Sequence, residues 1–247
     1  MTELGGLDTL HLCFGVSALK PLLGLANVDP IRPTRSSTPG STTPTSSSLV
    51  HPSLAGLQSL TSIVDVASHI NLTATALCLA AFIPVLQTTN SSDPVIVLLS
   101  SVAALIPAPT RALYAATKAA QLQLFESVAL ECESHANFEL VRAAAKAGKR
   151  RPERRHAVRF VSVCPGTIMS DFRVSAVDVR PGEEGEVKDA SWGAMQSAEG
   201  GKPKKVGDIL TTKQVADRAM HAVDGGLKGK VIIPAKYALA NTLKPFM

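Results

Sequence analysis

The chain has 247 residues, of which 45% are hydrophobic, and this length and composition predict one core and a single domain over 1–247. The formal net charge is only +5, and most of it comes from a run of five cations and one glutamate at 149–155. Because the rest of the chain is nearly neutral, we exclude a spread-out nucleic-acid surface and expect no nucleic-acid partner.

The first predicted element is a short strand. The mostly apolar sequence of residues 7–15 ends at Gly15, which predicts a buried strand closed by a glycine turn. The next segment, 30–52, is rich in serine, threonine and proline and is too polar to pack into a core. We expect it to be a disordered surface insertion ahead of the next helix.

A long helix is predicted over 57–87. Apolar residues recur at helical spacing in its first half, and residues 72–86 are apolar nearly all round. We expect one side of this helix to pack on a sheet and the other to meet another subunit. Asn71 lies inside it and begins an N-x-T pattern, but the interior of a helix disfavours glycosylation.

The middle of the chain predicts a strand, a loop and a second helix. Val95–Leu99 is an uninterrupted apolar run, typical of a parallel strand buried on both faces. Ser101 follows at its carboxyl end, where open α/β sheets bind their ligands. On the helix after the loop, Tyr114 and Lys118 stand four positions apart and share a face. A hydroxyl, a phenol and an ammonium are therefore predicted to converge at one crevice.

The second helix is followed by an extension and another strand. Residues 131–155 predict a helical insertion that ends in the basic run 149–156. Such a run is usually a solvated loop; binding to acidic partners or to a membrane surface is the alternative. Val158–Cys164 is the next predicted buried strand, and Pro165 and Gly166 end it.

The last part of the chain predicts a loop, a helix and a strand. Residues 172–207 are polar and rich in glycine and lysine, which is typical of a long irregular loop. Thr212 is predicted to cap a helix over Lys213–Val223, and Lys230–Ile233 is predicted to be the last strand.

Ser101 and the sequence Y-A-A-T-K, whose tyrosine lies thirteen positions later, resemble the signature of the short-chain dehydrogenase/reductase family. A lone Y-x-x-x-K is a weak signal, but here strand, serine, loop and Y-A-A-T-K follow the family's order. The resemblance implies an α/β fold of Rossmann-like, three-layer type with a mostly parallel sheet. The family's glycine-rich turn, T-G-x-x-x-G-x-G, does not precede Leu7. We therefore expect an N-terminally truncated form of that fold.

The resemblance implies four catalytic residues: Asn71, Ser101, Tyr114 and Lys118. Tyr114 would exchange a proton with the substrate oxygen, and the Lys118 ammonium and the oxidised nicotinamide would make its phenol more acidic. Ser101 would orient the substrate oxygen and stabilise its developing charge. Asn71 would connect Lys118 to solvent through a water molecule.

The resemblance also implies a dinucleotide cofactor, NADP or NAD, and no metal. Lys118 would hydrogen-bond the nicotinamide ribose, and the Ile168 amide and Ser170 hydroxyl would hold the carboxamide. In relatives the segment after the Pro-Gly turn covers the substrate, so 172–207 is predicted to be a mobile substrate lid. The residues expected to contact the cofactor are Gly15, Tyr114, Lys118, Pro165, Gly166, Ile168 and Ser170.

We therefore predict an NAD(P)-dependent oxidoreductase that interconverts a secondary alcohol and a carbonyl, with a small apolar substrate. The missing glycine-rich turn supports an alternative: a truncated, non-catalytic pseudoenzyme or partner-binding chain that does not bind dinucleotide. The resemblance further implies a homodimer formed through the two long helices.

The cysteines and apolar segments predict the compartment. The four cysteines are scattered singly, which predicts free thiols in a reducing, cytoplasmic environment. Residues 1–6 lack the basic region of a signal peptide. The longest apolar segment, 72–86, falls short of the ~18 residues of a membrane helix, so no transmembrane segment is expected.

Overall fold

Four parallel strands form the main sheet. In the computed structural model they are β1 (Thr9–Leu12), β2 (Val95–Leu99), β3 (Arg159–Pro165) and β6 (Gly229–Ile233), in the order β1-β2-β3-β6. Each pair of neighbours runs parallel. Every predicted strand is present, and the predicted α/β fold of Rossmann-like type is confirmed.

The structure describes residues 6–28, 51–88, 93–145, 156–173, 175–179 and 209–238. The predicted insertion 30–52 (except its last two residues), the basic run before residue 156 and most of the predicted lid 172–207 lie outside these residues. What we expect of those segments stays a prediction.

The first long helix has three parts. α2 (Leu54–Ser68), a π-helical turn (His69–Thr73) and α3 (Ala74–Gln87) follow one another without a break. The helix begins earlier than predicted because the Ser53 hydroxyl accepts a hydrogen bond of 3.0 Å from a backbone N–H in the first turn. π-Turns of this kind are rare and occur often at functional sites.

This continuous helix, Leu54–Gln87, is by length and composition able to cross a membrane: an 18-residue window within it has a mean hydropathy of 1.7, and 22% of that window is buried in the structure. The sequence-based expectation of no membrane segment counted only the apolar residues 72–86 of the helix predicted over 57–87. Core helices of soluble proteins meet the same criterion, and this one buries Asn71 and Thr75 in hydrogen bonds to other parts of the chain. Length and composition alone therefore do not make it a membrane segment.

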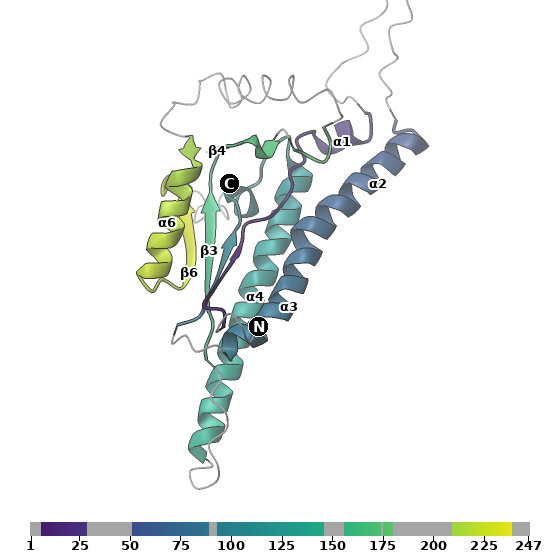
Figure 1. Ribbon diagram of the computed structural model, residues 1–247. Helices are drawn as coiled ribbons and strands as arrows, with labels where there is room; N and C mark the ends of the chain where they lie inside the picture. Colours follow the sequence, from purple (N-terminus) through teal and green to yellow (C-terminus); the bar gives the residue numbers. More distant parts are fainter. Residues whose placement is uncertain are drawn as a thin grey trace, which may run out of the picture.

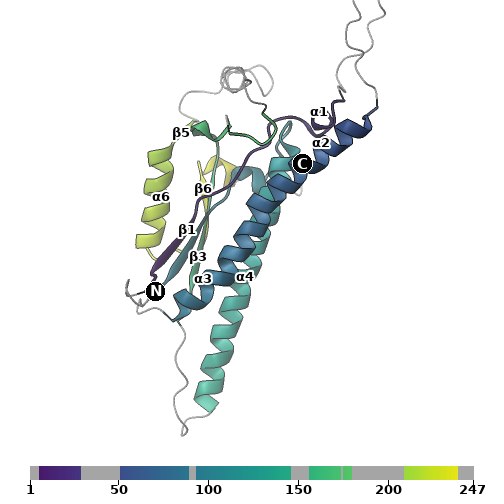
Figure 2. The ribbon, with the colours of Figure 1, turned by 45° about the vertical axis from the view of Figure 1, so that its right-hand side comes forward.

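The other two long helices are α4 (Ala112–Ala145) and α6 (Thr212–Asp224). α4 projects well beyond the amino edge of the sheet (Figures 1 and 2), as the predicted helical extension requires. The cap of α6 is Thr211, whereas Thr212 was predicted. The Thr211 hydroxyl accepts a hydrogen bond from the Gln214 N–H, and the Gln214 side chain accepts one from the Thr211 N–H.

Helices cover both faces of the main sheet, which gives the three predicted layers (Figure 1). Ile96 and Leu98 of β2 belong to the core shared with α3 and α4. Val95 and Val97 point the other way and belong to the core shared with α6. Because both faces of β2 are buried, its sequence is apolar at every position rather than at alternate ones.

Five short elements complete the described chain. β4 and β5 form a small parallel ladder, and α1 and two 3₁₀ turns lie in the loops that follow β1, β2 and β3. Their bounds are α1 Leu22–Leu25, η2 Val102–Ala104, β4 Ile168–Met169, η3 Asp171–Arg173 and β5 Leu210–Thr211.

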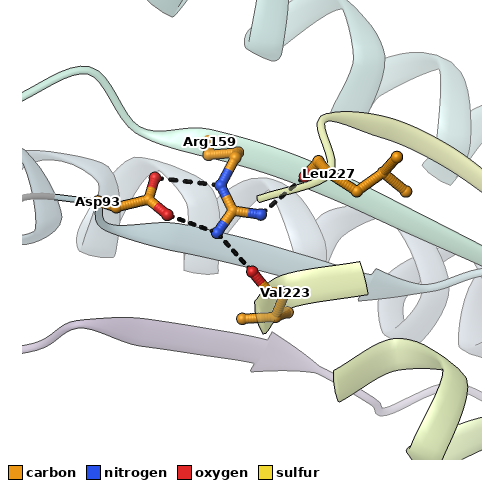
Figure 3. A network of polar contacts seen from close by, with 4 residues as sticks. All are labelled: Asp93, Arg159, Val223 and Leu227. Atoms are coloured by element: carbon orange, nitrogen blue, oxygen red, sulfur yellow. Dashed lines mark hydrogen bonds and ion pairs between the residues drawn. The ribbon is translucent and has the colours of Figure 1, made fainter. Parts of the chain in front are cut away.

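The amino edge of the sheet is held by one arginine, as Figure 3 shows. The Arg159 guanidinium donates to both carboxylate oxygens of Asp93, at 3.1 and 2.6 Å. It also donates to the carbonyl of Val223 at 3.0 Å and to that of Leu227 at 2.7 Å. The start of β3, the segment before β2 and the end of α6 are thereby tied together.

Candidate active site

The carboxyl edge of the sheet brings three predicted site residues together. Gly15 follows β1, and a Cβ atom on it would lie 3.0 Å from Lys118 Nζ and 3.1 Å from Asn71 Oδ1. The loop after β1 thus passes directly against both side chains, and a larger residue would push them away. The structure therefore brings Gly15, Asn71 and Lys118 to one place from three separate elements.

Asn71 lies in the π-turn and is completely buried. Its Oδ1 accepts a hydrogen bond of 2.9 Å from the Val16 N–H, and its Nδ2 donates to the Val16 carbonyl at 3.0 Å. Nδ2 also donates to Thr117 Oγ1 at 3.0 Å. The side-chain amide of Asn71 therefore pairs with the backbone N–H and carbonyl of Val16, as a neighbouring strand would. Its bond to Thr117 joins this loop to α4.

Lys118 is 3% exposed, an unusual place for an ammonium. Its Nζ donates to Gln121 Oε1 at 2.8 Å and to the Leu99 carbonyl, at the end of β2, at 3.3 Å. Burial lowers the pKa of Lys118 from 10.5 to about 8, against the opposing influence of the Cys164 and Cys13 thiols. The side chain therefore titrates near physiological pH.

Gln121 is the neutral partner that the Lys118 ammonium finds inside the protein. It is fully buried, and its Nε2 donates to Thr75 Oγ1 at 2.8 Å. The Thr75 hydroxyl in turn donates to the carbonyl of Asn71 at 3.0 Å. Because an ammonium can only donate, Gln121 must turn its oxygen to Lys118 and its NH₂ to Thr75. The orientation of every group in this buried series of hydrogen bonds, from Lys118 to the carbonyl of Asn71, is thus determined.

Tyr114 is 6% exposed and lies between two side chains. The Arg111 guanidinium carbon is 4.3 Å from the centroid of its ring. The Phe172 ring meets it edge-on, with centroids 5.9 Å apart and planes at 63°. Phe172 brings the start of the predicted lid against Tyr114.

Ser101 follows β2 and begins the 3₁₀ turn Val102–Ala104, which packs against α4. Its Oγ accepts a hydrogen bond of 3.1 Å from the Ala103 N–H, so its lone pairs are partly used in capping the turn. The serine thus lies at the carboxyl end of β2, where it was expected. Its role toward a substrate stays a prediction.

The remaining predicted cofactor residues lie after β3. Pro165 ends that strand, and the Gly166 N–H donates to the Ile233 carbonyl at 2.7 Å. Ile168 is held in the small ladder opposite Leu210. Ser170 is exposed and comes just before the turn that carries Phe172. The segment therefore leaves the carboxyl edge of the sheet, and among the described residues these four make no hydrogen bond to Asn71 or Lys118.

Three functional candidates were missed by reasoning from the sequence: Gln121, Thr75 and Arg111. A signal was present for Gln121, which lies three positions after Lys118 and so on nearly the same helix face. For Thr75 and Arg111 the sequence offered no comparable signal. Their partners, Gln121 and Ser17, lie 46 and 94 positions away.

Comparison with known proteins supports the resemblance. A model of the short chain dehydrogenase family matches residues 55–147, which include Asn71, Ser101, Tyr114 and Lys118. No curated protein matches the chain.

Solved structures share the fold. A short chain dehydrogenase from Burkholderia cenocepacia in complex with NADP aligns with a TM-score of 0.52 at 17% identity, over 98% of this chain and 66% of that one. A short chain dehydrogenase from Mycobacterium paratuberculosis bound to NAD gives 0.55 at 16% identity, over 94% and 64%. Levodione reductase gives 0.53 at 14% identity, over 96% and 69%. The chain thus spans about two-thirds of the length of these neighbours.

Proposed function

We propose that the chain is an NAD(P)-dependent oxidoreductase of short-chain dehydrogenase/reductase type, a proposal that the match of residues 55–147 to the short chain dehydrogenase model supports. Its reaction would interconvert a secondary alcohol and a carbonyl compound by hydride transfer. The observation that carries the proposal is the convergence of Gly15, Asn71 and Lys118 at the carboxyl edge, beside the helix that bears Tyr114. Two of the solved neighbours are described as bound to NADP or NAD.

The residues present fit the nicotinamide end of such a cofactor. Gly15 leaves the Lys118 ammonium and the Asn71 amide without a side chain in front of them. Of the three N–H groups of Lys118, two have the acceptors Gln121 and Leu99, so one can serve a ribose hydroxyl. When bound, the nicotinamide would supply or accept the hydride.

The protein would handle the proton and the charge on the substrate oxygen. Tyr114 would give its hydroxyl proton to that oxygen, or take it back in the reverse direction. The Ser101 hydroxyl would donate to the same oxygen and stabilise its developing negative charge. Lys118 would remain bound to Gln121 and orient the ribose. The substrate would be a small alcohol or carbonyl compound with apolar substituents.

A second candidate is a non-catalytic chain that does not bind dinucleotide. One observation favours it: the ring of Tyr114 is covered by Arg111 and Phe172. A partner-binding role would then use the helices rather than the carboxyl edge.

Titration of NADPH and of NADH, followed by nicotinamide fluorescence, separates the two candidates. We expect submillimolar binding by the wild-type protein and at least a tenfold weaker binding by Lys118→Ala. Lys213→Ala is the matched control, because Lys213 is exposed on α6 and pairs with Asp217. No binding by a folded wild-type protein would support the non-catalytic chain. Equal loss in both variants would contradict the proposed site.

The long helices would also form a homodimer. α2, α3 and α4 expose large apolar side chains that a partner could bury. A shallow groove between α3 and α4 adds apolar lining from Leu79, Ile83 and Val128. Light scattering should give twice the chain mass for the wild-type protein and the single mass for Leu77→Glu.

The four cysteines are free, and we place the protein in the cytoplasm.

A further inference from the structure

Tyr114 is in contact with a cation that the family signature does not contain. The guanidinium carbon of Arg111 lies 4.3 Å from the ring centroid, within the range of a cation–π contact. Burial lowers the pKa of Arg111, and the Tyr114 side chain opposes this lowering by its charge and by a hydrogen bond. For Lys118, in contrast, the side chains that oppose the lowering of the pKa by burial are the thiols of Cys164 and Cys13.

Arg111 is fixed in this place rather than loosely packed. One terminal nitrogen donates to Ser17 Oγ at 2.8 Å, and Ser17 is fully buried. The Asp178 carboxylate acts on the same guanidinium and is itself bound by the backbone N–H groups of Leu19 and Lys20. Among the described residues the buried Nε of Arg111 has no acceptor, so one N–H group of this side chain makes no hydrogen bond there.

From this contact we infer that Arg111 is a positioning residue that stabilises the phenolate form of Tyr114. The inference rests on the proposed function, because a phenolate is useful only if Tyr114 exchanges a proton with a substrate. A cation beside a phenol favours its ionised form, and the effect is strong where water is excluded.

Arg111 and Lys118 differ in the pH range over which they can act. An arginine stays charged at every pH at which proteins work. Lys118 loses its charge above about pH 8. Arg111 therefore keeps a positive charge beside Tyr114 in the range where the ammonium is lost. Three other charged groups lie close to this pair in space or along the chain. The Asp178 carboxylate acts on the Arg111 guanidinium, Lys118 follows Tyr114 by one helical turn, and Asp171 precedes Phe172, whose ring meets Tyr114.

Spectrophotometric titration of tyrosine tests the inference without cofactor or substrate. The chain has only two tyrosines, so Tyr237→Phe leaves Tyr114 as the one phenol whose ionisation changes the absorbance near 295 nm. In that background we expect Arg111→Met to raise the pKa of Tyr114 by on the order of one unit. Arg111→Lys keeps the charge and should raise it by less than half as much.

The controls separate charge from packing. Arg159→Met removes an arginine at the opposite edge of the sheet and should leave the Tyr114 titration unchanged. Arg111→Gln, which still offers a donor to Ser17, serves where Arg111→Met lowers the thermal unfolding temperature too far for titration. An unchanged Tyr114 titration in Arg111→Met or Arg111→Gln overturns the inference. So does an equal shift in Arg111→Lys and Arg111→Met, since charge would then be irrelevant.

The two proposals can fail separately. If the wild-type protein binds no NAD(P)H but Arg111→Met shifts the titration, the contact is as inferred and the proposed function is wrong. If NADPH binds in a Lys118-dependent manner and the titration does not move, only the role of Arg111 is wrong.

Discussion

The two edges of the sheet carry polar clusters of opposite design. At the amino edge, Arg159 meets the carboxylate of Asp93 in a two-pronged ion pair, and the carboxylate is 57% exposed. At the carboxyl edge, the buried ammonium of Lys118 meets the amide of Gln121 and a carbonyl, all neutral acceptors.

This difference separates a structural contact from a site. A charge that only holds elements together is best matched by an opposite charge, as Asp93 matches Arg159. The Arg159 side chain accordingly lowers the pKa of Asp93, by its hydrogen bond and by its charge. A buried cation with neutral partners is costly to the fold and has a lowered pKa, which is typical of functional sites. The lowered pKa of Lys118 thus favours the carboxyl edge over the amino edge as the candidate site.

The largest expected effect is on the pH dependence of stability. The folded protein holds Lys118 at a pKa of about 8, whereas the unfolded chain titrates near 10.5, so the unfolded state binds more protons between these values. Stability from this group therefore rises with pH from about 8 to 10.5, by about 3 kcal/mol. The free energy of unfolding can be measured by urea titration for the wild-type protein and for Lys118→Met at pH 7.5 and pH 10.5. The difference between the two proteins should show this rise. A difference independent of pH would place the ammonium in a solvated environment.

Gln121→Leu should have the next largest effect, because it leaves the Lys118 ammonium with the Leu99 carbonyl alone. We expect it to cost about 1–3 kcal/mol, more at pH 6.5 than at pH 9.5, where Lys118 is mostly neutral. Gln123→Leu is the matched control, since Gln123 lies on the same helix but is exposed. Its cost should stay below about 0.5 kcal/mol. Equal costs would mean that Gln121 adds nothing beyond helix packing.

The contribution of the Arg159–Asp93 cluster at the amino edge to the free energy of unfolding should depend least on pH in the neutral range. Arg159→Met removes the ion pair and two contacts to carbonyls and should cost about 1–2 kcal/mol at both pH 6.5 and pH 9.5. Asp93→Asn removes only the exposed carboxylate and should cost about 0.5 kcal/mol, less in high salt. Since the pKa of Asp93 is lowered in the folded state, its contribution is lost as the pH falls below about 4. A cost that changed between pH 6.5 and pH 9.5 would show that this cluster also titrates.

Residue order alone determined much of this protein. The apolar run Val95–Leu99 predicts a buried parallel strand because its pattern depends only on local residue types. The spacing of Tyr114 and Lys118 likewise places them on one face of α4, because helical periodicity is a local property. The edge of the sheet at which Ser101 lies follows from the same reasoning.

Only the tertiary structure decided which polar groups meet. The contacts Arg111–Ser17, Asn71–Val16 and Gln121–Thr75 join residues 94, 55 and 46 positions apart. No periodicity reports such pairs, because they depend on how α2, α3 and α4 pack against the loop after β1. The same packing excludes water from Lys118 and lowers its pKa. The local pattern named the candidate site residues, and the long-range packing supplied the neighbours that decide how they are hydrogen-bonded and, for Lys118, at which pH the side chain titrates.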